Sequence, residues 1–311
     1  MSGPGAPAPA TTLPVRNIGI ALTLGSAAGF AMNTPIAPLV YADGGNAATL
    51  MTARTGAAGL LALLLLLATR RLPRVPRAAW PWLIGVTLSL FLQGIGYLGS
   101  VAYIPVGLAA VIFFTWPIMV ALIDPLLGGP RLRALDALAF LIAFAGLALA
   151  IGPSLETLDP RGIALALLGA VGLAAFLLFS RKALESVSSL TVSLHANLGT
   201  VLLCMVTAPL LFGGLDFPAG ADGRWAMLAV CGFYTLALAL QFAALKLASA
   251  PMIAILFNLE PVISILAAAW LLGEVLSPDQ YLGGALVVLG LLLYGRSGRA
   301  RRVRAAVEAK G

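Results

Sequence analysis

Charged residues are scarce in this chain of 311 residues, since Lys, Arg, Asp and Glu together make up 10% of it. Soluble domains usually carry about 25% of them and disordered chains are also rich in charge, so both classes are excluded. Two cysteines are too few for a disulfide scaffold. One histidine leaves no zinc-type histidine motif. With no Walker-type lysine loop and no Ser/His/Asp arrangement, we expect no metal, no cofactor and no enzymatic activity.

Hydrophobic residues, in contrast, fill 60% of the chain, and its mean hydropathy is +1.01. A helix needs about 20 mainly apolar residues to cross a bilayer. Ten such runs are separated by Gly, Pro and charged residues: 17–40, 47–69, 80–102, 106–127, 134–152, 160–181, 188–212, 224–247, 249–272 and 278–296. The predicted fold is an all-α membrane protein whose ten transmembrane helices contact the lipid bilayer.

Basic residues are distributed unevenly between alternate loops. One side of the predicted membrane holds 16 Lys and Arg residues, the other side holds 2, and Arg54 lies inside a predicted span. Because basic loops stay in the cytoplasm, both termini are expected there. We expect a multi-pass plasma membrane protein, in the inner membrane of a bacterium. The net charge of +7 reflects this topology, and no nucleic-acid partner is expected.

The two halves of the chain resemble each other at an offset of 143–144 residues. The run Gly-Ile-Ala-Leu at 19–22 returns at 162–165, and Pro117 returns as Pro261. Each half holds five predicted spans, and an odd number inverts the second half, as in many secondary transporters. The predicted units are a disordered N-terminal tail (1–16), a first five-helix repeat (17–152), a second, inverted repeat (160–296) and a basic cytoplasmic tail (297–311).

A family resemblance rests on the stretch 258–274, which begins NLEP and ends WLLGE. It resembles the ninth-helix signature of the drug/metabolite transporter superfamily, in its EamA-type branch. The resemblance covers about residues 17–296 and implies ten helices in two repeats and export of small metabolites without ATP. The first half departs from the motif, because Trp116-Pro117 stands where Glu260-Pro261 does. The chain length, the cytoplasmic termini and Trp116-Pro117 are similar to YddG-type amino-acid exporters within that branch.

Polar and aromatic side chains inside the predicted spans are candidates for a substrate cavity. A charge in mid-span is a functional hypothesis by default, so Glu260 either meets substrate or a proton, or caps backbone around Pro261. His195 either titrates near neutral pH or is a hydrogen-bonded structural group. Arg54 is expected to extend to the outer headgroups. The candidate cavity residues are Asn33, Tyr97, Ser100, Trp116, His195, Tyr234, Gln241, Asn258 and Glu260.

These residues predict a secondary exporter of small metabolites that works by alternating access. Neutral polar groups beside wide aromatic surfaces suit amino acids, including aromatic ones, and no pair of basic residues is evident at mid-depth to hold a phosphate. Two short hairpins, 103–105 and 248–251, are expected to swing open and closed. The alternative left open is a non-transporting polytopic scaffold or a lipid-handling protein, and the inverted repeat favours transport over it.

Overall fold

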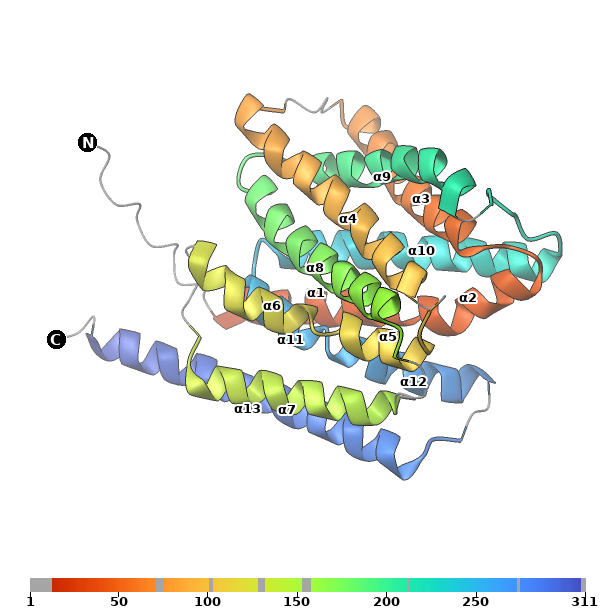
Figure 1. Ribbon diagram of the computed structural model, residues 1–311. Coiled ribbons are helices and arrows are strands. Elements are labelled where there is room, and N and C mark those ends of the chain that lie inside the picture. The colour runs from red at the N-terminus through yellow and green to blue at the C-terminus, as the bar shows by residue number, and fades with distance from the viewer. Residues whose placement is uncertain are drawn as a thin grey trace.

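The computed structural model describes residues 13–70, 75–100, 103–127, 132–152, 158–211, 213–272 and 275–308. In these segments the chain is helical, with no strand. The helices are α1 (Leu13–Ala31), α2 (Asn33–Ala42), α3 (Ala47–Ala68), η1 (Arg77–Ala79), α4 (Trp80–Ser100), α5 (Val106–Phe113), α6 (Trp116–Ile123), η2 (Asp124–Leu127), α7 (Ala134–Ile151), α8 (Pro160–Ala183), α9 (Ser189–Leu211), α10 (Ala221–Ala244), α11 (Ala250–Leu256), α12 (Leu259–Leu272) and α13 (Pro278–Glu308). The start of α1 and the end of α13 lie at the same end of the bundle (Figure 1).

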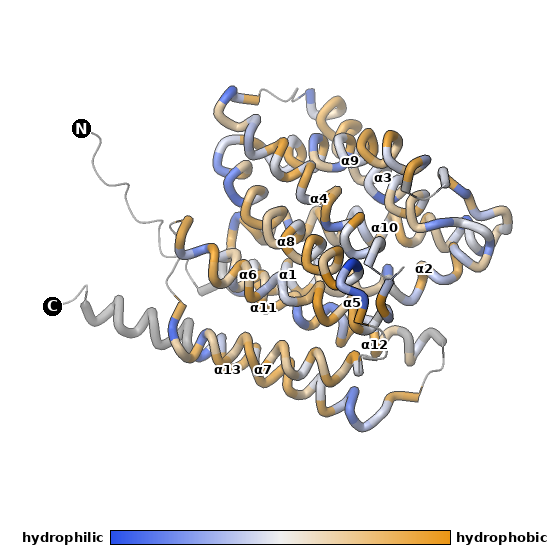
Figure 2. Tube along the Cα trace, viewed as in Figure 1, coloured by the Kyte–Doolittle hydropathy of each residue, from blue (hydrophilic) through white to orange (hydrophobic). Residues whose placement is uncertain are grey.

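Nine helical stretches of the described residues are long and apolar enough to cross a membrane, and they fall on the first nine predicted spans. The tenth predicted span lies within α13, which continues as a helix to Glu308 through most of the expected C-terminal tail. At the other end α1 already begins at Leu13, inside the expected N-terminal tail, and residues 1–12 lie outside the described part. Figure 2 shows hydrophobic residues along the helices and hydrophilic ones gathered near the two ends of the bundle.

Three of these stretches are interrupted near their middle, and one rule explains all three. A proline lacks the backbone N–H and its ring collides with the carbonyl four residues earlier. The first stretch breaks at Met32, three residues before Pro35. The fourth breaks between α5 and α6, just before Pro117, and the ninth breaks between α11 and α12, just before Pro261. Each interruption is complete enough to divide its span into two helices.

Other helices pack so closely that only small residues fit between them. At the crossing of α4 and α8, a Cβ added to Gly96 would lie 2.4 Å from the backbone nitrogen of Gly169. At the crossing of α7 and α13, a Cβ on Gly146 would lie 2.6 Å from the carbonyl oxygen of Gly283. Small residues let membrane helices approach closely. The glycine-rich stretch around Gly96 therefore serves helix packing, as its place inside a span predicts.

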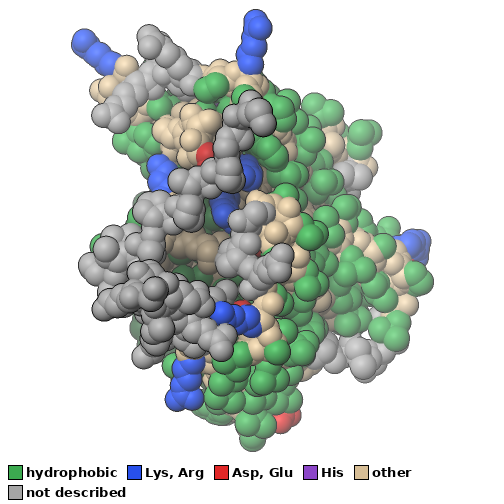
Figure 3. All heavy atoms as spheres, turned by 90° about the vertical axis from the view of Figure 1, so that its left-hand side faces the viewer, with side chains coloured by type: hydrophobic (Ala, Val, Ile, Leu, Met, Phe, Trp, Pro, Cys, Tyr) green, Lys and Arg blue, Asp and Glu red, His purple; other side chains and the backbone are tan. Residues whose placement is uncertain are grey.

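The two ends of the bundle are built differently. At the end away from the termini, the turn after α2 is hydrogen-bonded to the segment before α10 and to the first turn of α10. The Asp43 carboxylate accepts a bond from the Gly223 amide at 2.7 Å, and the side-chain nitrogen of Asn46 donates to the Asp216 carboxylate at 2.9 Å. At the end that carries the termini, Figure 3 shows a hollow near the middle of the face, with Lys and Arg side chains around it.

Candidate functional site

Arg54 occupies the centre of the most polar cluster within the bundle. It comes from α3, and its guanidinium carbon lies 4.9 Å from the centre of the Tyr234 ring on α10. The Tyr234 hydroxyl donates a hydrogen bond of 3.2 Å to Oδ1 of Asn197 on α9. Both Tyr234 and Asn197 are buried, while Arg54 is half-buried with its Nε enclosed. The prediction that Arg54 extends to the headgroups is wrong, because an aromatic face inside the bundle holds its charge.

Glu260 belongs to the same region of the bundle, in the first turn of α12, directly after the break in the ninth span. Its carboxylate is within electrostatic range of both Arg54 and the Tyr97 hydroxyl on α4. Tyr41 on α2 also lies within range of Arg54. Glu260 and Tyr97 lie deep in the protein, and each keeps part of its surface accessible. Five helices (α3, α4, α9, α10 and α12) and the broken first span thus converge on one cation and one anion.

A row of aromatic rings leads from this cluster into the broken helices. Phe30 on α1 meets Tyr234 edge-on, with ring centres 5.7 Å apart, and lies 6.1 Å from Phe257. Phe257 in turn meets Trp116 edge-on at 5.8 Å. Edge-to-face and tilted contacts at these distances are favourable. The row therefore joins the break of the ninth span to the start of α6, and it brings Trp116 and Tyr234 of the predicted set into one continuous apolar wall.

The other predicted cavity residues differ in whether their polar side-chain atoms have hydrogen-bond partners in the protein. Asn258 donates from its side-chain amide to the Ile255 carbonyl, and Ser100 donates to the Tyr97 carbonyl, so both stabilise nearby backbone. Three further members are buried and have a side-chain atom without any hydrogen-bond partner in the described chain: Oδ1 of Asn33, Nε1 of Trp116 and Oε1 of Gln241. Buried polar atoms are normally hydrogen-bonded, so these three atoms are candidates for contact with water or a ligand.

His195 lies apart from this cluster, near the start of α9 at the end of the bundle that carries the termini. Its Nδ1 is 2.8 Å from the Thr191 carbonyl, and its ring meets that of Trp80, the first residue of α4, at 5.4 Å. The Thr87 hydroxyl donates to the backbone carbonyl of the same residue. These contacts are those of a structural histidine that ties α9 to α4, the alternative that the sequence left open.

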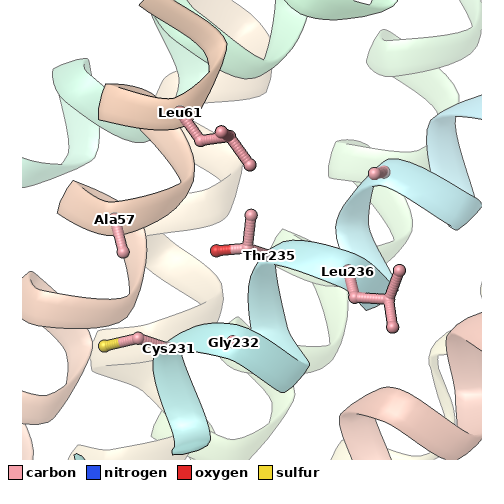
Figure 4. Close-up of a pocket in the computed structure, with 7 residues that line it drawn as sticks. Ala57, Leu61, Cys231, Gly232, Thr235 and Leu236 are labelled. Atoms are coloured by element: carbon pink, nitrogen blue, oxygen red, sulfur yellow. The ribbon is translucent and has the colours of Figure 1, made fainter. Parts of the chain in front are cut away.

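A surface groove between α3 and α10 has a volume of about 430 Å³. Figure 4 shows Ala57 and Leu61 from α3 facing Cys231, Gly232 and Thr235 from α10. The lining is apolar apart from the Thr235 hydroxyl, and Leu61 is 45% exposed. This groove lies on the outside of the same two helices that carry Arg54 and Tyr234, and its composition suits lipid rather than a polar ligand.

Sequence reasoning missed Arg54 and Asn197 as members of the cluster. A signal was present, because the run at 53–56 returns at 196–199 in the internal match, which predicts that Arg54 and Asn197 occupy corresponding positions of the two halves. Both are polar in an apolar span, and Tyr234 contacts both. The Gly273-Glu274 end of the NLEP…WLLGE signature lies outside the described residues. Within the described residues no group of His, Cys, Asp and Glu side chains could hold a metal ion.

A bundle of apolar helices that encloses a charged cluster between broken spans defines a polytopic membrane protein with a central polar site. The comparisons with known proteins identify the class more closely. The EamA-like transporter family matches twice along the chain, at residues 17–152 and 160–296. The chain therefore belongs to the EamA-like transporter family, and it is a membrane transporter.

Two individual relatives agree with this assignment. An uncharacterized transporter of Archaeoglobus fulgidus is 24% identical over 214 residues, which cover 69% of this chain and 76% of the relative. A solved crystal structure, titled only as that of a protein, superposes with a TM-score of 0.72 at 22% identity, over 92% of this chain and 99% of the other. That structure supports the fold, and the family favours transport over catalysis.

Proposed function

We propose that this transporter is a secondary exporter of amino acids, aromatic ones included. The observation that carries the proposal is the cluster of Arg54, Tyr234 and Glu260 inside the spans of a mainly apolar bundle. Charged side chains inside membrane spans are costly and mark substrate or ion pathways. The partly accessible rings of Phe30 and Tyr97 beside them offer apolar surface for a substrate side chain. Neighbouring opposite charges suit a small zwitterion.

The packing of the helices supports an inverted repeat and alternating access. In the proposed repeat, α3 corresponds to α9 and α7 to α13, and the members of each pair pack against each other. The pair α1–α10 corresponds in the same way to the pair α8–α4. Such an arrangement has a pseudo-two-fold relation, from which two related states follow. The hydrogen-bonded end away from the termini and the hollow at the other end correspond to a state open towards the termini.

The distribution of charge supports an orientation with both termini in the cytoplasm of a bacterium. The described basic residues at the terminal end of the bundle include Arg70, Arg77, Arg133, Arg181, Lys182 and Lys246. The opposite end carries mainly acids: Asp43, Asp159, Asp216, Asp222 and Asp279. Because basic loops remain on the cytoplasmic side, the hollow of Figure 3 then faces the cytoplasm, where an exporter loads its substrate.

The test is uptake of labelled phenylalanine into liposomes that contain the purified protein, with and without an imposed proton gradient. Transport by a carrier predicts saturable uptake and accelerated exchange when unlabelled amino acid is preloaded. Liposomes without protein give the background. Saturable uptake of none of the twenty amino acids, from a folded protein, would contradict the assignment and favour a scaffold or lipid-handling role. Inhibition by a sugar phosphate and by no amino acid would move the substrate to another class.

A further inference from the structure

The Arg54 guanidinium has hydrogen-bonding capacity that the protein leaves unused. Within the described chain, no carboxylate forms an ion pair with it. Its Nε is buried without a partner, and Tyr234 offers it the face of a ring rather than an acceptor atom. A guanidinium carries five N–H donors in a planar fork that matches the two oxygens of a carboxylate or phosphate. The cluster therefore contains a guanidinium whose donors are free to bind an anion.

The surroundings of Arg54 favour an anion of single charge. The other Lys and Arg side chains that the structure describes lie near the two ends of the bundle, so among the described residues Arg54 is the cation available inside the spans. Glu260 lies within electrostatic range and repels further negative charge. The single positive charge of Arg54 balances the single negative charge of a carboxylate, whereas a dianionic phosphate would keep one unbalanced charge near Glu260. The chemistry of the site thus selects a carboxylate.

Glu260 provides the complementary group for the rest of a zwitterion. It is close enough to Arg54 for electrostatic interaction but does not form an ion pair with it, and its side chain is partly accessible. We propose that Arg54 binds the substrate carboxylate and that Glu260 accepts hydrogen bonds from the substrate ammonium. This inference rests on the proposed function. Arg54 is then the residue that distinguishes amino acids from the corresponding amines and amides.

Tyr234 and Asn197 act on this site by positioning Arg54. Asn197 fixes the Tyr234 hydroxyl through a buried hydrogen bond of 3.2 Å, and the ring of Tyr234 supports the guanidinium from one face. A cation over an aromatic face is attracted to it without losing its N–H donors at the edge. The guanidinium is held in place while its donors remain free for the substrate.

The experiment compares three ligands that differ by one charged group: phenylalanine, phenylalaninamide, which lacks the carboxylate, and 3-phenylpropionate, which lacks the ammonium. Each competes against uptake of labelled phenylalanine and is also tested for thermal stabilisation of the purified protein. In the wild type the amide should bind about ten- to hundredfold more weakly than phenylalanine, the usual effect of losing a charge-assisted contact. Arg54→Gln should bring this ratio close to one, and Arg54→Lys should retain part of it. Glu260→Gln should instead reduce the advantage of phenylalanine over 3-phenylpropionate.

Arg161 provides the matched control. Its guanidinium also lies over a tyrosine ring, 4.6 Å from the centre of Tyr103, but its side chain is 72% exposed at the end of the bundle. Arg161→Gln should leave all three ligands in the wild-type order. An unchanged ratio in a folded Arg54→Gln protein overturns the inference. If Arg54→Gln does not fold, the affinities of Arg54→Lys and of the wild type for phenylalanine and its amide provide the test. Equal binding of the two ligands to the wild type then overturns the inference.

The same ligands separate this inference from the proposed function. Stabilisation by 3-phenylpropionate that depends on Arg54, without binding or uptake of any amino acid, supports the carboxylate site and contradicts amino-acid export. Uptake of phenylalanine, with a preference over phenylalaninamide that is the same in the wild type and in Arg54→Gln, supports export and contradicts the carboxylate site. Failure of every carboxylate to bind contradicts both.

Discussion

Removing the Tyr234 hydroxyl should destabilise the protein without abolishing substrate selectivity. The hydroxyl donates to Oδ1 of Asn197, and both residues are buried, at 3% and 0% exposure. The Asn197 amide nitrogen bonds to Ser193 on its own helix, so Tyr234→Phe leaves Oδ1 as an unpaired buried acceptor. Such a group costs about 1–3 kcal/mol. The phenyl ring still supports Arg54, so the preference for a carboxylate ligand should persist.

Thermal unfolding in detergent measures this cost. A loss of about 1–3 kcal/mol corresponds to a decrease of about 2–5 °C in Tm for a chain of 311 residues. Tyr97→Phe is the control, because the structure gives that hydroxyl no hydrogen bond to any described residue and its side chain is partly accessible. Tyr234→Phe and Asn197→Leu remove the same hydrogen bond. The double variant should therefore lose less stability than the sum of the two single variants. Unfolding of Tyr234→Phe at the wild-type temperature would refute the reasoning.

Three further predictions concern transport, packing and topology. Glu260→Gln should lower the affinity for amino acids about ten- to hundredfold in liposomes, and full activity with an unchanged pH profile would reduce Glu260 to a structural group. Gly96→Ala should lower the thermal stability, because its Cβ would lie 2.4 Å from backbone of α8, whereas Gly232→Ala, with nothing within 4 Å, should not. In a cysteine-free background, an impermeant thiol reagent added from outside should label Ala219→Cys and spare Ala78→Cys, both at exposed sites; the reverse pattern would invert the orientation.

The spans and their interruptions follow from local chemistry, which is why sequence reasoning located them. Apolar runs of sufficient length define the first nine spans, and proline chemistry defines the breaks before Pro35, Pro117 and Pro261. The limits of the terminal helices do not follow from hydropathy. A helix continues into polar sequence at little cost once it has been nucleated by a packed segment, as α13 does beyond residue 296.

The composition of the central cluster depends on which helix faces are turned inward, and a single sequence carries little information on that. Arg54 lies about a third of the way into its span, so depth alone leaves snorkelling and burial equally open. What decides between them is Tyr234, which is 180 positions further along the chain and contacts Arg54 only after α3 and α10 have packed. His195 shows the converse, because the hydrogen-bond partner of its ring, the Thr191 carbonyl, is on its own helix.

The closely packed helices α7 and α13 are distinct from the interrupted span that carries Glu260, and this difference determines which part of the site can move. The α7–α13 pair is held by contacts that exclude even a methyl group at Gly146, so these two helices have little freedom to move against each other. The cluster, in contrast, takes Glu260 from directly behind the break in the ninth span. Backbone at that break lacks regular helical bonding, and its freed groups are satisfied by neighbours such as the Asn258 side chain. A small rotation at the break therefore moves Glu260 relative to Arg54, which an uninterrupted α3 holds in place. Binding of one substrate by both groups would couple occupancy of the site to the angle between α11 and α12.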